Sequence, residues 1–447
     1  MRPFSSVPLI SPLAALTCAL SLILVLSACN TPLNQQDPSQ GVSAEVLAES
    51  DLALPNLAPT IKTVTRRPAL PPPQARTNWS QAAGGARHLT GHAPYSNAPS
   101  LAWTFAISGP MRRGRITTSG PLIMGDRAYA LSPDLIVYAL DLTSGKLVWQ
   151  QALVDHDGRD GLFGGGLAAD NRRLYVSTGA GHLHGLDRIS GEIDWTSDLP
   201  SPARAGPTLA SGVLYVSDLT GQLSAYSLEG AHLWTHESQG ASLSTLSPSA
   251  PAVSENGIYY VQPNGLVSAL LPDGQEGWQF DSASQGPAGD ASNIITAARA
   301  LPVVDHNTLL VSRWANRTLA LSTNLGELMW EFPMGATSTP AVTNQFIFMV
   351  TKDGALRALE RQTGAQIWAL DLNQEAQRRS KASWFGPLMA GNRLIVSSTQ
   401  GILKMIDPAS GTITSTLKVG QPIVSDMTLA QNTLLVITRD GLIRAYR

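Results

Sequence analysis

A turn-and-strand unit that recurs along the chain constrains its fold more than any other feature. In the clearest copy, residues 139–149, a strand ends, a turn follows at Gly145, and Trp149 stands four residues after that glycine. Six copies keep both residues, and a seventh at 407–415 keeps the glycine turn without the tryptophan. Successive tryptophans are 38 to 52 residues apart, which is the length of one β-propeller blade.

The rest of each period predicts two more strands, and the two ends of the repeat region predict a closed ring. Alternating apolar runs such as 127–131 precede each unit, so one period holds four short strands. The C-terminal run 421–447 supplies three strands, whereas 101–105 is an isolated strand that carries Trp103. Pairing these two regions would remove the free edges of an open sheet. The sequence therefore predicts an all-β, eight-bladed β-propeller of four-stranded antiparallel blades over 99–447, with seven blades as the alternative count.

Composition agrees with this architecture and argues against some functions. The 39 glycines and 30 prolines suit short strands joined by tight turns. Lys and Arg number 31 against 33 Asp and Glu and are scattered along the sequence, which is unlike the basic patch of a nucleic-acid-binding protein. Aromatic side chains on the outermost strands can fill the space between neighbouring blades. The tryptophans expected in this role are Trp103, Trp149, Trp195, Trp234, Trp278, Trp330 and Trp368.

The N-terminus predicts export and lipid attachment. An apolar run over 13–27 is too short for a membrane span and ends in Leu-Ser-Ala-Cys, where small residues precede Cys29 as in a lipobox. Acyl chains on Cys29 would anchor the protein stably. We therefore expect a lipoprotein signal peptide at 1–28 and a lipidated cysteine with a flexible, proline-rich tether at 29–98. An ordinary signal peptide and an uncleaved anchor are the alternatives.

The repeat resembles that of pyrroloquinoline-quinone-type propellers, and the whole chain resembles the BamB family of outer-membrane assembly lipoproteins. The likeness rests on the order of lipobox, tether, the Asn-Trp-Ser-Gln run at 78–81, and the blades, with further similar runs at 157–167 and 300–304. The resemblance implies a non-catalytic scaffold anchored at the periplasmic face of the outer membrane. It also implies docking on the POTRA domains of the barrel-inserting subunit and help in inserting β-barrel proteins, with unfolded barrel precursors as a second candidate partner.

The same resemblance assigns docking to loops of two adjacent middle blades, at 242–251 and 290–299. Leu246 stands where better-studied members have an arginine, and the second loop lacks their paired aspartates. We expect an apolar anchor with a charged rim, unless the leucines belong to a blade core or an extended loop pairs with a POTRA strand instead. The candidate contact residues are Leu243, Ser244, Leu246 and Arg299.

Two rival functions belong to other classes. A quinone-dependent dehydrogenase would have similar repeats. Such enzymes carry adjacent cysteines, however, and this chain has only Cys18 and Cys29. A propeller that binds envelope polysaccharide is the other alternative. We predict no catalytic residue, no cofactor and no metal.

Two pairs of histidines come nearest to a metal-ligand pattern. His182 and His184 share one face of a predicted strand, and the sequence places no third ligand beside them. We therefore interpret both as exposed or channel-facing side chains. His88 and His92 are interpreted in the same way.

Overall fold

The computed structural model describes residues 61–111, 119–153, 164–237, 250–262, 264–282, 300–312, 317–374 and 381–447. These residues belong to one compact unit, which begins at Pro59 and ends at Arg447. Almost all of their regular structure is strand, and η3 (Ala82–Gly84) is a single short 3-10 turn. Within the described ranges, no helix has the length and apolar character needed to cross a membrane.

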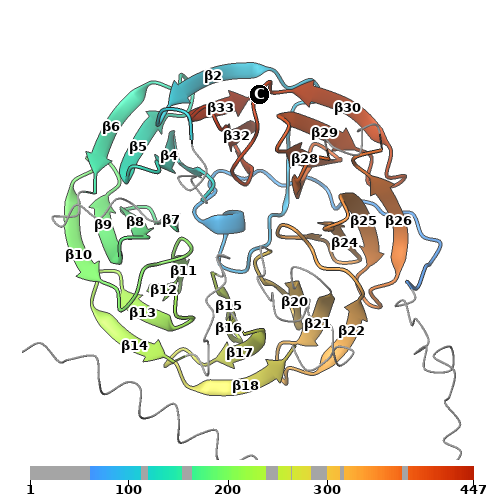
Figure 1. The fold of residues 1–447 in the computed structure, drawn as a ribbon, viewed down its shortest axis with the longest axis horizontal. Helices are drawn as coiled ribbons and strands as arrows, with labels where there is room; N and C mark the ends of the chain where they lie inside the picture. Colours follow the sequence, from blue (N-terminus) through green and yellow to red (C-terminus); the bar gives the residue numbers. More distant parts are fainter. Residues whose placement is uncertain are drawn as a thin grey trace, which may run out of the picture. The chain divides into compact units, whose positions relative to one another are not determined.

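Eight sheets surround one centre, and each is a blade (Figure 1). Blade 1 contains β3 (Leu122–Met124), β4 (Arg127–Leu131), β5 (Ile136–Asp141) and β6 (Leu147–Ala152). Blade 2 contains β7 (Gly165–Ala169), β8 (Arg173–Thr178), β9 (His182–Asp187) and β10 (Ile193–Asp198), and blade 3 contains β11 (Thr208–Ala210), β12 (Val213–Ser217), β13 (Leu223–Ser227) and β14 (His232–His236). Blade 4 contains β15 (Ala252–Ser254), β16 (Gly257–Val261), β17 (Leu266–Leu270) and β18 (Glu276–Asp281).

Blades 5 to 8 complete the ring. Blade 5 contains β19 (Val303–Asp305), β20 (Thr308–Ser312), β21 (Thr318–Ser322) and β22 (Leu328–Phe332). Blade 6 contains β23 (Ala341–Val342), β24 (Phe346–Val350), β25 (Ala355–Glu360) and β26 (Gln366–Asp371), and blade 7 contains β27 (Trp384–Ala390), β28 (Arg393–Ser398), β29 (Ile402–Ile406) and β30 (Ile413–Lys418). Blade 8 contains β31 (Thr428–Ala430), β32 (Thr433–Ile437), β33 (Leu442–Tyr446) and β2 (Leu101–Ala106). A fifth strand, β1 (His92–Ala93), joins blade 7 in parallel with β27.

The ring closes where the two ends of the body meet. Strand β2 pairs antiparallel with β33, and Trp103 lies opposite Ala445. Blade 8 therefore takes its outermost strand from the start of the body and its other three from the C-terminus, as predicted. The predicted fold class is confirmed, and the number of blades is eight.

Burial falls from the middle of each blade towards its outer edge. Strands β16, β20, β24 and β32 are buried throughout, because each is covered on both faces by neighbouring blades. The outermost strand β6 alternates between exposed and half-buried residues. The turn before it holds Gly145 at φ 71°, a left-handed conformation that favours glycine.

Each tryptophan of the repeat packs on the glycine turn of the next blade. A Cβ added at Gly326 would lie 2.4 Å from Cε3 of Trp278, so only glycine leaves room for the indole. The indole N–H also donates to a carbonyl of the same turn, for example from Trp330 to Arg361 O at 2.8 Å and from Trp103 to Leu142 O at 2.9 Å. Seven seams between blades are closed in this way.

The seam between blades 7 and 8 is built differently, because Ser415 stands at the tryptophan position of β30 and is exposed. Residues 93–100 cross this seam instead. The ring of Tyr95 is buried there, and Arg393 donates to Ser96 O at 2.7 Å and to Asn97 O at 3.1 Å. The N-terminal segment therefore takes the place of the missing indole.

The compact body begins earlier than expected. The sequence predicted a tether up to residue 98 and a propeller from residue 99. Residues 61–98 belong to the compact unit, and in Figure 1 they run from the outer edge of β26 across the middle of the ring to β2. This segment was expected to be flexible because it cannot bury enough apolar surface to order itself. Hydrogen bonds to strand edges of the blades order it instead. The expected signal peptide and the tether up to residue 60 lie outside the described residues.

Candidate functional site

The centre of the ring is capped at one end by residues 76–93. Proceeding around the ring, this segment reaches blades 8, 1, 2, 3, 4, 5 and 7, so it covers strand edges that would otherwise face the channel unpaired. The bonds are Gln431 N to Arg76 O (2.9 Å), Trp79 N to Ile123 O (2.7 Å), Ala169 N to Ser80 O (2.8 Å), Leu209 N to Gln81 Oε1 (2.7 Å), Val253 N to Ala86 O (2.8 Å), Val304 N to Arg87 O (3.1 Å) and Gly391 N to Ala93 O (3.0 Å).

Three side chains fix this cap. The amide of Gln81 accepts from Leu209 N and donates to Leu209 O, so it pairs with β11 as a strand would. His88 is buried and donates from Nδ1 to Pro302 O at 2.7 Å. Because burial disfavours the imidazolium, the pKa of His88 falls to about 4. The guanidinium of Arg76 stacks on the buried ring of Trp79, 4.8 Å from its centroid.

His92 is buried as well, with Nδ1 2.6 Å from Pro71 O and Nε2 accepting from Asn392 N at 3.0 Å. The interpretation of His88 and His92 as exposed or channel-facing was therefore wrong. A histidine in the cap can satisfy both ring nitrogens with main-chain groups, which a sequence pattern does not reveal.

Above the cap, the inner strands enclose a cavity of about 90 Å³. Its walls are mainly small or apolar residues such as Gly120, Gly206, Leu122 and Leu388, with the buried Thr90 among the few hydroxyls. This volume is well below the roughly 300 Å³ at which cofactor clefts begin. In the part of the chain that the structure describes, no group of three His, Cys, Asp or Glu converges as metal ligands do. The described residues that line this cavity do not fit a central quinone with its calcium ion.

His182 and His184 lie on β9 with ring centroids 5.9 Å apart. Nδ1 of His182 is 3.1 Å from the carboxylate of Asp198, and Nδ1 of His184 is 2.9 Å from Oγ1 of Thr196. Both histidines thus contact β10 of their own blade. His182 is half-buried and His184 is buried, so the interpretation of His184 as exposed or channel-facing was wrong as well. The structure brings no third ligand to them among the described residues.

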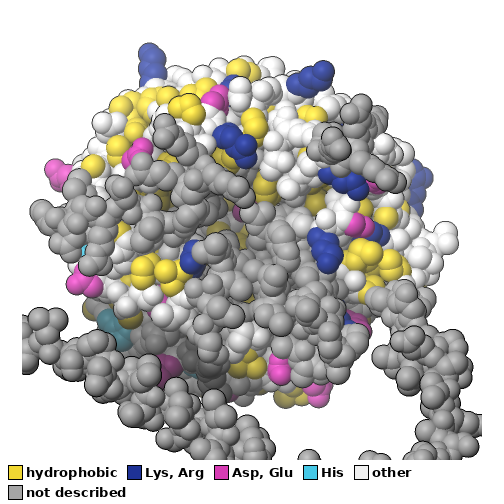
Figure 2. All heavy atoms as spheres, viewed as in Figure 1, with side chains coloured by type: hydrophobic (Ala, Val, Ile, Leu, Met, Phe, Trp, Pro, Cys, Tyr) yellow, Lys and Arg dark blue, Asp and Glu magenta, His cyan; other side chains and the backbone are white. Residues whose placement is uncertain are grey.

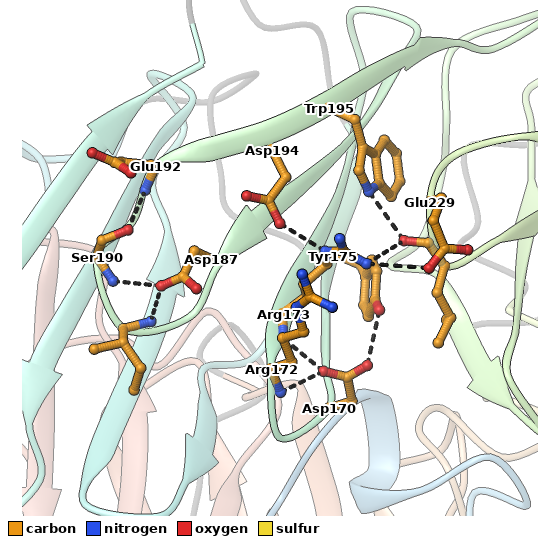
Figure 3. Close-up of polar contacts among 12 residues, drawn as sticks. Asp170, Arg172, Arg173, Tyr175, Asp187, Ser190, Glu192, Asp194, Trp195 and Glu229 are labelled. Carbon is orange, nitrogen blue, oxygen red and sulfur yellow. Dashed lines mark hydrogen bonds and ion pairs between the residues drawn. The ribbon is translucent and has the colours of Figure 1, made fainter.

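The seam between blades 2 and 3 carries a dense polar network (Figure 3). Arg173 donates from Nε to Asp194 at 2.7 Å and from Nη1 to Leu228 O at 3.2 Å, so it links the two blades. Tyr175 donates to Asp170 at 2.8 Å in the same view. The bonds of Arg173 fix blades 2 and 3 relative to each other.

The predicted contact residues Leu243, Ser244, Leu246 and Arg299, and the predicted lipidation site Cys29, lie outside the described residues. The ends of the two loops are described. One loop joins β14 to β15, and the other joins β18 to β19, so both run from the outermost strand of one blade to the innermost strand of the next. Pro251, at the end of the first loop, accepts a hydrogen bond from Thr208 Oγ1 at 2.9 Å.

Comparison with known proteins gives the family. The sequence pattern of a family described as "Outer membrane protein assembly factor BamB" matches residues 133–370 and 352–447, which is well over half of the chain. The chain belongs to the BamB family. The BamB of Yersinia pestis is 24% identical over 334 residues, which make up 73% of this chain and 83% of that protein.

Solved structures share the fold. The crystal structure of BamB from Moraxella catarrhalis superposes with a TM-score of 0.65 at 17% identity and covers 78% of this chain and 100% of that one. Quinohemoprotein alcohol dehydrogenase from Comamonas testosteroni superposes with a TM-score of 0.63 at 12% identity, over 83% of this chain and 80% of that one. At such identities the likeness concerns the fold alone.

Proposed function

We propose that this chain is a lipid-anchored, non-catalytic scaffold of the outer-membrane β-barrel assembly machinery. It binds the POTRA domains of the barrel-inserting subunit and assists insertion of β-barrel proteins. The family match over residues 133–447 carries the proposal, since the BamB relatives are named as outer membrane protein assembly factors. The capped centre and the small cavity support binding through loops in preference to chemistry at the axis.

The docking surface in this proposal consists of the loops at 242–251 and 290–299. Leu243 and Leu246 form the apolar anchor, Ser244 lies between them in sequence, and Arg299 contributes a charge at the rim. Both loops connect neighbouring blades, whose strands hold the two ends of each loop.

The test is a titration of the protein against the purified POTRA domains of the barrel-inserting subunit. We expect Leu243→Ala with Leu246→Ala to weaken binding by more than about 1 kcal/mol, or roughly fivefold. Leu271→Ala with Leu325→Ala is the matched control, because these leucines are 45% and 67% exposed elsewhere on the surface. Equal affinity of the two double variants would show that the docking site is misplaced.

Two further measurements separate the alternatives. Cys29→Ser should move the protein from the membrane fraction to the soluble periplasmic fraction if the acyl chains are its anchor. In a pull-down from envelope extract, recovery of the barrel-inserting subunit supports assembly, whereas recovery of glycans alone supports a polysaccharide-binding propeller. Binding of added quinone with calcium would instead favour a dehydrogenase.

A further inference from the structure

The near-neutral net charge of −2 conceals a strong separation of charge around the ring. The described residues of 122–332, which include blades 1 to 5, contain 18 Asp and Glu against 7 Lys and Arg. The described residues of 61–121 and 341–447, which form the cap, β2 and blades 6 to 8, include 15 Lys and Arg against 6 Asp and Glu. The basic residues look scattered along the sequence, but the blade order gathers them on one side.

The separation is present at the surface. On one face of the ring, dark blue side chains lie mostly over blades 6 to 8, and magenta side chains lie mostly along the margin of the other blades (Figure 2). Exposed basic residues of the cap and blades 6 to 8 are Lys62, Arg66, Arg67, Arg87, Lys352, Lys381, Lys418 and Arg439. Exposed acidic residues of blades 1 to 5 are Asp126, Asp134, Glu192, Asp194, Asp198, Glu229, Glu237, Glu255, Asp273, Glu276, Asp281, Glu327 and Glu331.

An independent feature points to the same side of the ring. The described chain begins on the outer edge of blade 6, where Thr63 forms a parallel bridge with Gln366. Val64 N donates to Gln366 O at 3.0 Å, and Gln366 N donates to Lys62 O at 2.7 Å. Arg66 forms an ion pair with Glu360 just beside this bridge. The 60 residues that precede the described chain, Cys29 among them, therefore join the body at the rim of blade 6.

We infer that the basic rim of blades 6 to 8 is a docking surface for the headgroups of anionic phospholipids. A body with positive charge on one side and negative charge on the other turns its positive side towards a negatively charged bilayer. The tether joins on that same side, so lipid anchoring and electrostatics favour one orientation, in which blades 2 to 4 point away from the membrane. The inference rests on the proposed anchoring for its location in the cell and for the second of these two arguments, whereas the charge separation stands without it.

The first test measures lipid binding without the anchor. The chain from residue 29 with Cys29→Ser is mixed with vesicles of phosphatidylethanolamine and phosphatidylglycerol, or of phosphatidylcholine alone. Binding to the anionic vesicles should be stronger and should disappear at high salt. Lys62→Gln with Lys418→Gln should weaken it by up to roughly 25-fold, since each basic residue near the surface contributes about fivefold.

The matched control removes the same charge from the acidic side. Lys146 and Arg172 are exposed on blades 1 and 2, and Lys146→Gln with Arg172→Gln should leave vesicle binding within about twofold of the parent chain. Equal weakening by both pairs, or equal binding to neutral and anionic vesicles, would overturn the inference. Because the chain in this assay carries no acyl group, failure of the proposed anchoring at Cys29 does not affect the result.

The second test measures orientation. Cys18 and Cys29 are the only cysteines, so the same chain accepts single labels at Ser415→Cys on blade 7 or at Leu233→Cys on blade 3. Both positions are exposed on outermost strands. Energy transfer to an acceptor on the lipid headgroups should be higher from position 415 than from position 233. Equal transfer, or the reverse order, would contradict the inferred orientation.

Discussion

Seven seams of the ring and the eighth show two ways of joining neighbouring blades. At the seven, an indole from one blade fills the space above a glycine of the next, as Trp278 does over Gly326. At the eighth, between blades 7 and 8, the N-terminal segment supplies Tyr95 and accepts two hydrogen bonds from Arg393. The first kind of seam belongs to the repeat. The second needs a segment that precedes the repeat.

The difference shows how a repeat chain can form a closed ring. An indole lock needs a receiving turn on the next blade, and blade 8 has none, because its outermost strand β2 and its third strand β33 come from opposite ends of the body. There the chain pairs Ser100 with Arg447 through two main-chain bonds of 2.8 and 3.0 Å. The segment that caps the channel also joins the last seam, so both features should depend on the same residues.

Removing an indole should have the largest effect on stability. Trp330 is 8% exposed, and Trp330→Ala removes its contact with Gly364 and its bond to Arg361 O. We expect a loss of about 4 kcal/mol in the free energy of unfolding, measured by urea denaturation. Leu325→Ala, on the same blade but 67% exposed, should cost less than about 0.5 kcal/mol. Similar losses for both variants would mean that the indole does not hold the seam.

Opening the eighth seam should cost somewhat less and should act locally. Tyr95→Ala removes a buried ring between Arg393 and Tyr446, and we expect a loss of about 3 kcal/mol. Hydrogen exchange should accelerate first at Gly391 N and Arg447 N, whose acceptors lie in the N-terminal segment. Tyr95→Phe keeps the ring and loses only a long bond of 3.5 Å, so it should resemble the parent protein. Uniform acceleration over all blades in Tyr95→Ala would contradict a local role.

The cap should make stability depend on pH, whereas the indole seams should not. The pKa of His88 is about 4 in the folded chain and about 6.5 when unfolded, so protonation favours unfolding. The contribution of neutral His88 to the free energy of unfolding is complete above pH 6.5 and is lost as the pH falls towards 4. At pH 5 the loss should be about 2 kcal/mol. His88→Asn keeps a donor for Pro302 O and removes the titration. The free energy of unfolding of both chains is measured by urea denaturation at pH 7.5 and pH 5. If it fell by the same amount in both chains, His88 would not be the titrating group.

The ring was predictable because the spacing from glycine to tryptophan, as from Gly145 to Trp149, recurs along the chain. This spacing has a steric reason, since the glycine leaves room for an indole. The isolated strand that carries Trp103 predicted the closure of the ring in the same way. The cap was not predictable in this way, since residues 76–93 are held by main-chain bonds to strands distant in sequence, and Gln81 and His88 follow no periodic pattern. The separation of charge was missed because it appears only once the order of the blades is known.

The smallest expected effect comes from adding an indole where the repeat lacks one. Ser415→Trp should change the free energy of unfolding by less than about 0.5 kcal/mol, since the next blade offers no glycine turn to receive the ring and residue 415 is exposed. Ser415→Ala is the control for loss of the hydroxyl, and urea denaturation compares the three chains. A gain of more than about 1 kcal/mol would mean that the eighth seam keeps a vacant indole site. The two kinds of seam would then differ in one residue and not in how they are built.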